Sequence, residues 1–159
     1  MPTFLRFLML LSLVVWIGGI IFFSFVVAPT VFSVLPTRHL AGAVVNRSLA
    51  TLHWMGIFSG VVFVVASLIY TRMSSGAAYP FAARHLLVYL MLLLTIVSHF
   101  GIAAKMATLR TDMGEIDRLS QDDTRRVQFN KLHAWSTRLE GTVFFLGLAV
   151  LFLTARRLS

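Results

Sequence analysis

The sequence predicts an all-α fold, an integral membrane four-helix bundle with helices that extend beyond the bilayer on one face. Its composition is the first reason: 58% of the 159 residues are hydrophobic and 13% are charged. Soluble domains average ~45–50% apolar and ~25% charged residues. The other reasons are four long apolar stretches and two predicted helices that are longer than the apolar stretches they contain. At this length we expect residues 1–159 to form a single transmembrane domain.

The apolar stretches predict the membrane spans. They lie at about residues 4–28, 49–70, 86–104 and 141–155. The first three approach the ~20 residues that cross ~30 Å of hydrocarbon, and Leu132, Trp135 and Leu139 extend the fourth backwards. None shows the alternation of a strand, and backbone that faces lipid must be helical.

The segments between the spans predict where the bundle protrudes. Pro36-Thr37 allows only a tight turn after the first helix. We expect the first helix itself to continue through Pro29 with a kink. Ser120 is a serine cap, with an acid three residues on, for a last helix that runs unbroken from Gln121 to Arg157. Its 37 residues would measure about 55 Å. We call the protruding end the wide end, and the end with both termini the narrow end.

The formal net charge of +8 indicates lipid rather than nucleic acid as the partner. Arg6, Arg72, Arg84 and the pair 156–157 flank apolar runs, where basic residues meet anionic headgroups. The wide end holds nine basic residues and the narrow end five, which favours a cytoplasmic wide end. Because the first helix usually dominates and Arg6 precedes it, we expect both termini in the cytoplasm, in a bacterial inner membrane.

Histidines are the candidates for cofactor ligation, since the chain has no cysteine. His53 and His99 fall at similar depth on antiparallel helices, and His53 shares a face with Gly56 and Gly60, so it should point into the bundle. The pair could ligate a haem iron, or one of them a chlorophyll magnesium or another metal ion. The alternative is that both are buried polar residues that bridge helices by hydrogen bonds.

A second set of polar residues lies in the wide half: Arg38, His39, His133, Ser136 and Glu140. Glu140 is the sole acid at a membrane boundary, where it could relay protons, hold a cation or pair with Arg47 or Asn46. The set predicts a surface for a partner or ligand. Ordinary capping and solvation of the helix ends is the alternative.

Four short motifs resemble a known family: Trp16-x-Gly18-Gly19, Ala28-Pro29-x-x-Phe32, Arg38-His39-x-x-Gly42 and Phe129-x-x-Leu132-His133-x-x-Ser136. They are similar to the small four-helix membrane family that includes transmembrane protein 205 and bacterial proteins with a domain of unknown function. The architecture is more distantly similar to copper-resistance D-like membrane proteins and membrane-type protoporphyrinogen oxidases. The resemblance implies a four-helix fold and no agreed activity, and the family usually has asparagine where this chain has Glu140.

These patterns favour a non-enzymatic membrane protein, an accessory or partner-binding subunit of a larger complex or a membrane oligomer. The nucleophile elbow, the zinc-protease motif and the phosphate loop of common enzymes do not occur. The alternative is a haem-, chlorophyll- or metal-binding redox protein that uses His53 and His99. A small transporter is disfavoured, because the two halves show no internal repeat.

Overall fold

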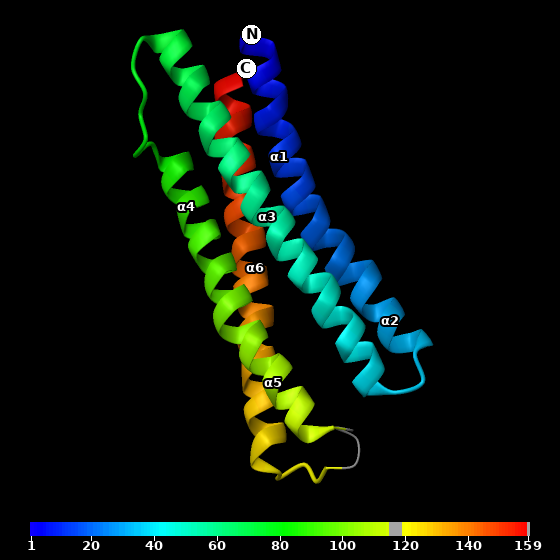
Figure 1. The fold of residues 1–159 in the computed structure, drawn as a ribbon. Helices are drawn as coiled ribbons and strands as arrows, with labels where there is room; N and C mark the ends of the chain where they lie inside the picture. Colours follow the sequence, from blue (N-terminus) through cyan, green and yellow to red (C-terminus); the bar gives the residue numbers. More distant parts are fainter. Residues whose placement is uncertain (115–118, 159) are drawn as a thin grey trace.

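The computed structural model describes residues 1–114 and 119–158, and their side chains as far as Arg156. Throughout these residues the chain is helical apart from short connections (Figure 1). Four of the helices are long and apolar enough to cross a membrane: Pro2–Val34, Arg38–Ser75, Ala83–Met113 and Thr124–Arg156. The predicted all-α membrane bundle is therefore confirmed, and the chain is an integral membrane protein.

The first long helix consists of α1 (Pro2–Phe22), the π-helical segment η1 (Phe23–Val27) and α2 (Ala28–Val34). As predicted, it passes through Pro29 without ending. Proline has no N–H to donate and its ring crowds the preceding turn. A π-helical turn directly before it is a known way to relieve such a break.

The second long helix, α3 (Arg38–Ser75), follows the tight turn that Pro36 predicts. Thr37 caps its start, because the threonine Oγ1 accepts a hydrogen bond from the Leu40 N–H at 3.2 Å. Gly76, with φ +72°, ends it in the left-handed conformation that favours glycine.

The third long helix runs further than the sequence suggested. It consists of α4 (Ala83–Ile96), the π-helical η2 (Val97–Ala103) and α5 (Ala104–Met113). The predicted span closed at residue 104 because Lys105 begins a polar segment. No proline or glycine occurs between Ala104 and Met113, so the helix continues until Gly114, where φ is +62°.

The last helix, α6 (Thr124–Leu158), is continuous as predicted, but its predicted start was wrong. Ser120 does not cap it. Ser120 instead forms a turn in which its carbonyl accepts from the Asp123 N–H at 3.3 Å. Asp123 is the cap: its carbonyl accepts from Val127 N–H at 3.0 Å and its Oδ1 from Arg125 N–H at 2.9 Å. A carboxylate also suits the positive end of the helix dipole.

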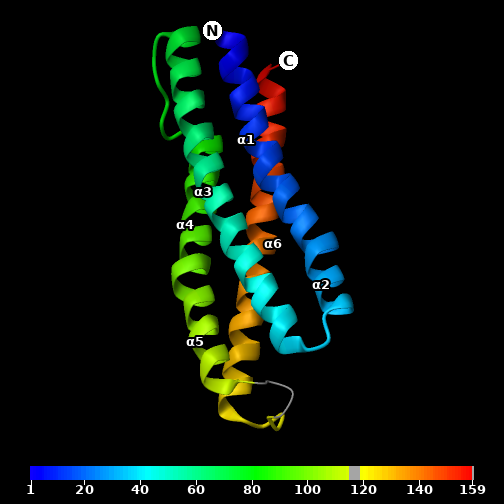
Figure 2. The same cartoon turned by 45° about the vertical axis from the view of Figure 1, so that its right-hand side comes forward.

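The bundle is held together by small residues that face large ones. A Cβ added at Gly56 would lie 2.5 Å from Nε1 of Trp16, and one added at Gly60 would lie 2.7 Å from both Trp16 and Leu92. The Trp16 indole therefore occupies the groove that the two glycines leave on α3. This pair explains why α1 and α3 run side by side for much of their length (Figures 1 and 2).

The outside of the bundle is apolar over much of its area. Phe25, Phe58 and Phe145 keep 76%, 71% and 69% of their surface exposed. Contiguous apolar surface of this kind is costly in water and suits a lipid environment. Of the three tryptophans, Trp16 is buried, whereas Trp54 and Trp135 are exposed.

Both termini lie at the narrow end, and α5 with the start of α6 reaches furthest from them (Figure 2). The 38 residues of α3 and the 35 of α6 correspond to about 57 and 52 Å. Each helix therefore exceeds the ~30 Å hydrocarbon core. At this wide end α2 and α6 diverge in both views.

Candidate functional site

The centre of the candidate site is a hydrogen bond between two ionisable side chains from different helices. Nε2 of His53 on α3 lies 2.6 Å from Oε1 of Glu140 on α6. His53 is 1% exposed, which confirms that it faces the bundle interior, and the Glu140 side chain is 15% exposed. Ser98 of η2 adds its Oγ at 3.5 Å from the same Oε1. Each group thereby satisfies a polar neighbour that lipid could not.

His99 lies next to this pair. Its ring centroid is 5.5 Å from that of His53, in edge-to-face orientation, and 5.4 Å from that of Trp54. The sequence-based expectation that the two histidines meet at similar depth is therefore met. Nδ1 of His53 and Nδ1 of His99 are both buried, with no hydrogen-bond partner among the described residues.

The hydrogen-bond partner of Glu140 differs from the one expected from the sequence. The sequence suggested Arg47 or Asn46 of the second helix, whereas the hydrogen bond in the structure goes to His53 on that helix. His53 lies inside the span, where the charge of an arginine would be costly to bury. Arg47 is exposed and is not among the residues that line the cavity beside Glu140.

Glu140 also lines a cavity of about 990 Å³ between the first helix, α3, α5 and α6. One face of α6 forms its long wall, with residues three or four apart in sequence: Arg126, Phe129, His133, Ser136, Glu140 and Phe144. Opposite them lie Phe25, Pro29 and Phe32 of the first helix. Its lining is therefore cationic and polar at the wide end and apolar towards the middle of the helices.

Arg110 of α5 closes the wide end of the cavity. Its guanidinium lies directly over Gly42 of α3, where an added Cβ would come within 3.0 Å of Nη2. Its Cζ lies 5.4 Å from the centroid of the Phe129 ring on α6. Nε of Arg110 is buried and makes no hydrogen bond to the described residues. Three helices thus hold one guanidinium at the cavity wall.

Two further arginines line the same end. Arg126 donates from Nη1 to the carbonyl of Leu119 at 2.7 Å, which fixes the connection before α6 beside the cavity. Arg38 lies at the start of α3. Among the described lining residues, three arginines and one glutamate, Glu140, give a positive balance. A cavity with this lining attracts an anionic group to its wide end.

Of the five predicted surface residues, the structure brings four to the cavity: Arg38, His133, Ser136 and Glu140. His39 is not among the lining residues; it is half-buried, and its Nδ1 has no hydrogen-bond partner among the described residues. Arg110 and Arg126 were not predicted as site residues from the sequence. The signal available for Arg110 was a basic residue about one turn before Gly114, the glycine that ends an otherwise unbroken helix.

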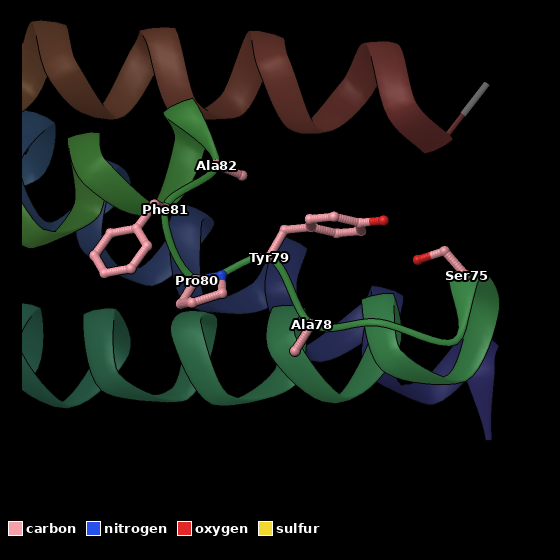
Figure 3. A pocket seen from close by; sticks show the side chains of 6 residues that line it. All are labelled: Ser75, Ala78, Tyr79, Pro80, Phe81 and Ala82. Atoms are coloured by element: carbon pink, nitrogen blue, oxygen red, sulfur yellow. The ribbon is translucent and has the colours of Figure 1, made fainter.

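A smaller hollow of about 540 Å³ lies at the narrow end, in the connection between α3 and α4 (Figure 3). Ser75 and the loop residues Ala78, Tyr79, Pro80, Phe81 and Ala82 line it. None of these side chains is charged. Close to the loop, His85 is fully buried and its two ring nitrogens lie 2.8 Å from the Tyr79 carbonyl and 2.8 Å from Ser67 Oγ. His85 therefore anchors the loop.

One known protein family matches this chain. The model of a domain of unknown function, DUF4149, matches residues 11–115, about two thirds of the chain. The chain belongs to the DUF4149 family. In this DUF4149 chain the matched segment runs from α1 to the end of α5, so it includes His53, His99 and Arg110, whereas the α6 wall of the cavity lies beyond it. No curated protein and no solved structure matches the chain.

Proposed function

We propose that this DUF4149 protein is a non-enzymatic membrane protein that binds an amphipathic molecule of the bilayer in the cavity between α2 and α6. The observation that carries the proposal is the cavity itself. Its volume of about 990 Å³ lies at the upper end of the range usual for small-molecule sites. Its lining changes from charged to apolar along its length, and an amphipathic molecule has the same division.

The partner-binding role expected from the sequence fits this proposal. If the chain is an accessory subunit of a larger complex, it would supply the bound molecule to that complex. In an oligomer, the bound molecule would lie at the surface between the subunits. The likeness to transmembrane protein 205 and copper-resistance D-like proteins belongs to the same proposal. Three of the four motifs that suggested it contribute residues to the cavity lining, among them Phe32, Gly42 and His133.

Two threonines of α6 provide a matched test. Thr137 lines the cavity and Thr142 does not, although both are exposed and both donate to the carbonyl four residues earlier, at 3.1 and 2.9 Å. The protein is exchanged into detergent that contains phosphatidylglycerol and phosphatidylcholine, and native mass spectrometry counts the bound lipids. Thr137→Trp should remove the most tightly held lipid, and Thr142→Trp should keep it. Equal retention by both variants would contradict the proposal.

A specific observation favours a second candidate, a porphyrin or metal cofactor at His53 and His99. Both Nδ1 atoms are buried, and Glu140 holds His53 through Nε2, as carboxylates orient metal-binding histidines. Within the described residues no three His, Cys, Asp or Glu side chains could hold a metal ion together. A cofactor that brings its own ligands, such as a porphyrin, would suit two histidines.

The visible absorption spectrum of the purified protein tests the second candidate. A porphyrin bound through the His53 and His99 imidazoles should give a strong visible band. His99→Leu should remove this band, and Phe100→Leu should leave it unchanged. Protein without a visible band, after expression with an adequate supply of porphyrin, would rule out this cofactor.

A further inference from the structure

We propose that the ligand is an anionic phospholipid whose phosphate is bound by Arg110 and Arg126 and whose acyl chains lie along the aromatic wall of the cavity. This inference rests on the proposed function and names the ligand class. It depends on three features of the cavity: the position of its cations, the apolar wall that continues from them, and the place of its only carboxylate among the described lining residues.

The cations are placed as a phosphate site requires. The Arg110 guanidinium is held by contact with Gly42 on α3 and by the Phe129 ring on α6. Its buried Nε–H has no acceptor among the described residues. A phosphate oxygen would supply one, and a guanidinium binds two such oxygens side by side. Arg126 lines the same end of the cavity and keeps one Nη1–H on the Leu119 carbonyl.

The apolar wall distinguishes a lipid from free phosphate. Beyond the arginines the lining includes Phe25 and Phe145, which are 76% and 69% exposed. Large exposed rings on helices of a membrane protein contact acyl chains. Free phosphate would use none of this wall, whereas a phospholipid would cover it and leave its headgroup at the wide end. At this end α3 and α6 begin, and both are longer than the hydrocarbon core is thick.

Glu140 fixes the direction in which the lipid lies. It is the one acidic side chain in the described lining, and it sits between the arginines and Phe144 on the α6 face. Its hydrogen bond to His53 keeps it on the cavity wall. A phosphate close to Glu140 would be repelled, so the headgroup stays with the arginines and the chains pass Glu140 towards the middle of the bundle.

The test compares lipids and charges. Protein freed of native lipid is titrated with phosphatidylglycerol or with phosphatidylcholine in detergent, and native mass spectrometry gives the dissociation constant of the first bound lipid. Phosphatidylglycerol should bind about tenfold more tightly than its zwitterionic counterpart, since each arginine near a headgroup contributes severalfold. Arg110→Gln with Arg126→Gln should abolish this preference, and the corresponding pair of lysine substitutions should restore part of it.

The control removes two charges from the same half of the molecule. Arg47 and Arg138 are exposed residues of α3 and α6 that do not line the cavity, and Arg47→Gln with Arg138→Gln should leave the preference intact. A preference lost equally in both glutamine pairs would show general surface attraction and overturn the inference, as would equal binding of the two lipids by the native protein. If Thr137→Trp still removes bound lipid in that case, the proposed cavity function survives without the anionic ligand. Inorganic phosphate that competes as well as the lipid would point to free phosphate and also overturn it.

Discussion

At the scale of single residues, the carboxyl group of Glu140 is the group whose surroundings matter most. It is mostly shielded from solvent, within an apolar part of α6, and it has two polar neighbours, His53 and Ser98. Breaking a buried pair leaves the remaining group without a partner, which costs more than the pair contributes. The hydrogen bond to His53 should therefore be visible as coupling between two substitutions.

A double-mutant cycle measures that coupling. His53→Leu alone should lower the free energy of unfolding by about 2 kcal/mol, because Glu140 loses its partner. The double variant with Glu140→Leu should be less destabilised than the sum of the single variants, by about 1–3 kcal/mol. Unfolding in mixed detergent micelles gives the four free energies. Additive effects, with coupling near zero, would show that the 2.6 Å contact does not stabilise the fold.

Asp123 predicts a pH dependence at the start of α6. Hydrogen bonds from the Arg125 side chain, and then from its backbone N–H, lower the Asp123 pKa from 3.8 to about 2. A depressed carboxyl pKa stabilises the folded state above pH 3.8, and the stabilisation is lost as the pH falls through about 2. The protection of the Arg125 amide against exchange should fall over that interval. Asparagine caps a helix but does not titrate, so Asp123→Asn should lack the step; the same step in that variant would contradict this.

Single residues also show which features of the site could be predicted from the sequence and which could not. The burial of His53 followed from its glycine neighbours on one helix face. The identity of Glu140's partner did not follow, because it depends on how two distant helices rotate about their axes. The cap at Asp123 rather than Ser120 was decided by a turn of three residues, and both are good capping residues.

At the scale of helices, the two π-helical segments lie where the site is. η1 supplies Phe23, Ser24 and Phe25 to the cavity, and η2 carries Ser98 and His99. A π-helical turn adds one residue to the ring of each hydrogen bond and so rotates the side chains that follow it. Nothing in the hydropathy pattern signals such a turn. The sequence thus predicted the long helices but not the local rotation that orients the site.

Gly60 tests the packing of α1 on α3. A methyl group there would lie 2.7 Å from both Trp16 and Leu92, so Gly60→Ala should lower the free energy of unfolding by about 1–3 kcal/mol. Gly18 of α1 has nothing within 4 Å of an added Cβ, so Gly18→Ala should be neutral or stabilising. Thermal unfolding in detergent compares the two. Equal stability of both variants would show that the Trp16 groove is loosely packed.

At the scale of the whole molecule, the described bundle has a narrow end with both termini (Figure 1). At its wide end, arginines line the cavity. Composition and span lengths predicted this shape, because lipid leaves a chain few alternatives to helices. The cavity was not predictable from them. It arises where α2 and α6 diverge, which depends on side-chain volumes along three helices at once.

The orientation of the molecule stays a prediction, and the absence of cysteine makes it simple to test. With both termini in the cytoplasm, a membrane-impermeant maleimide added to intact cells should label Ser120→Cys and leave Thr3→Cys unlabelled. Both positions are exposed in the structure, one at each end. After the cells are opened, both should react. The reverse pattern in intact cells would place the wide end in the cytoplasm.

Photo-crosslinking locates the bound lipid on the protein directly. A phosphatidylglycerol with a photoreactive group in its acyl chain is added at one molecule per protein, activated by light, and its attachment sites are located by peptide mass spectrometry. If the lipid lies in the cavity, attachment near Phe25 and Phe144 of the cavity wall should exceed that at Phe58, which is exposed on α3 and does not line the cavity. Attachment spread evenly over the exposed apolar surface, with Phe58 labelled as strongly as the wall, would contradict it.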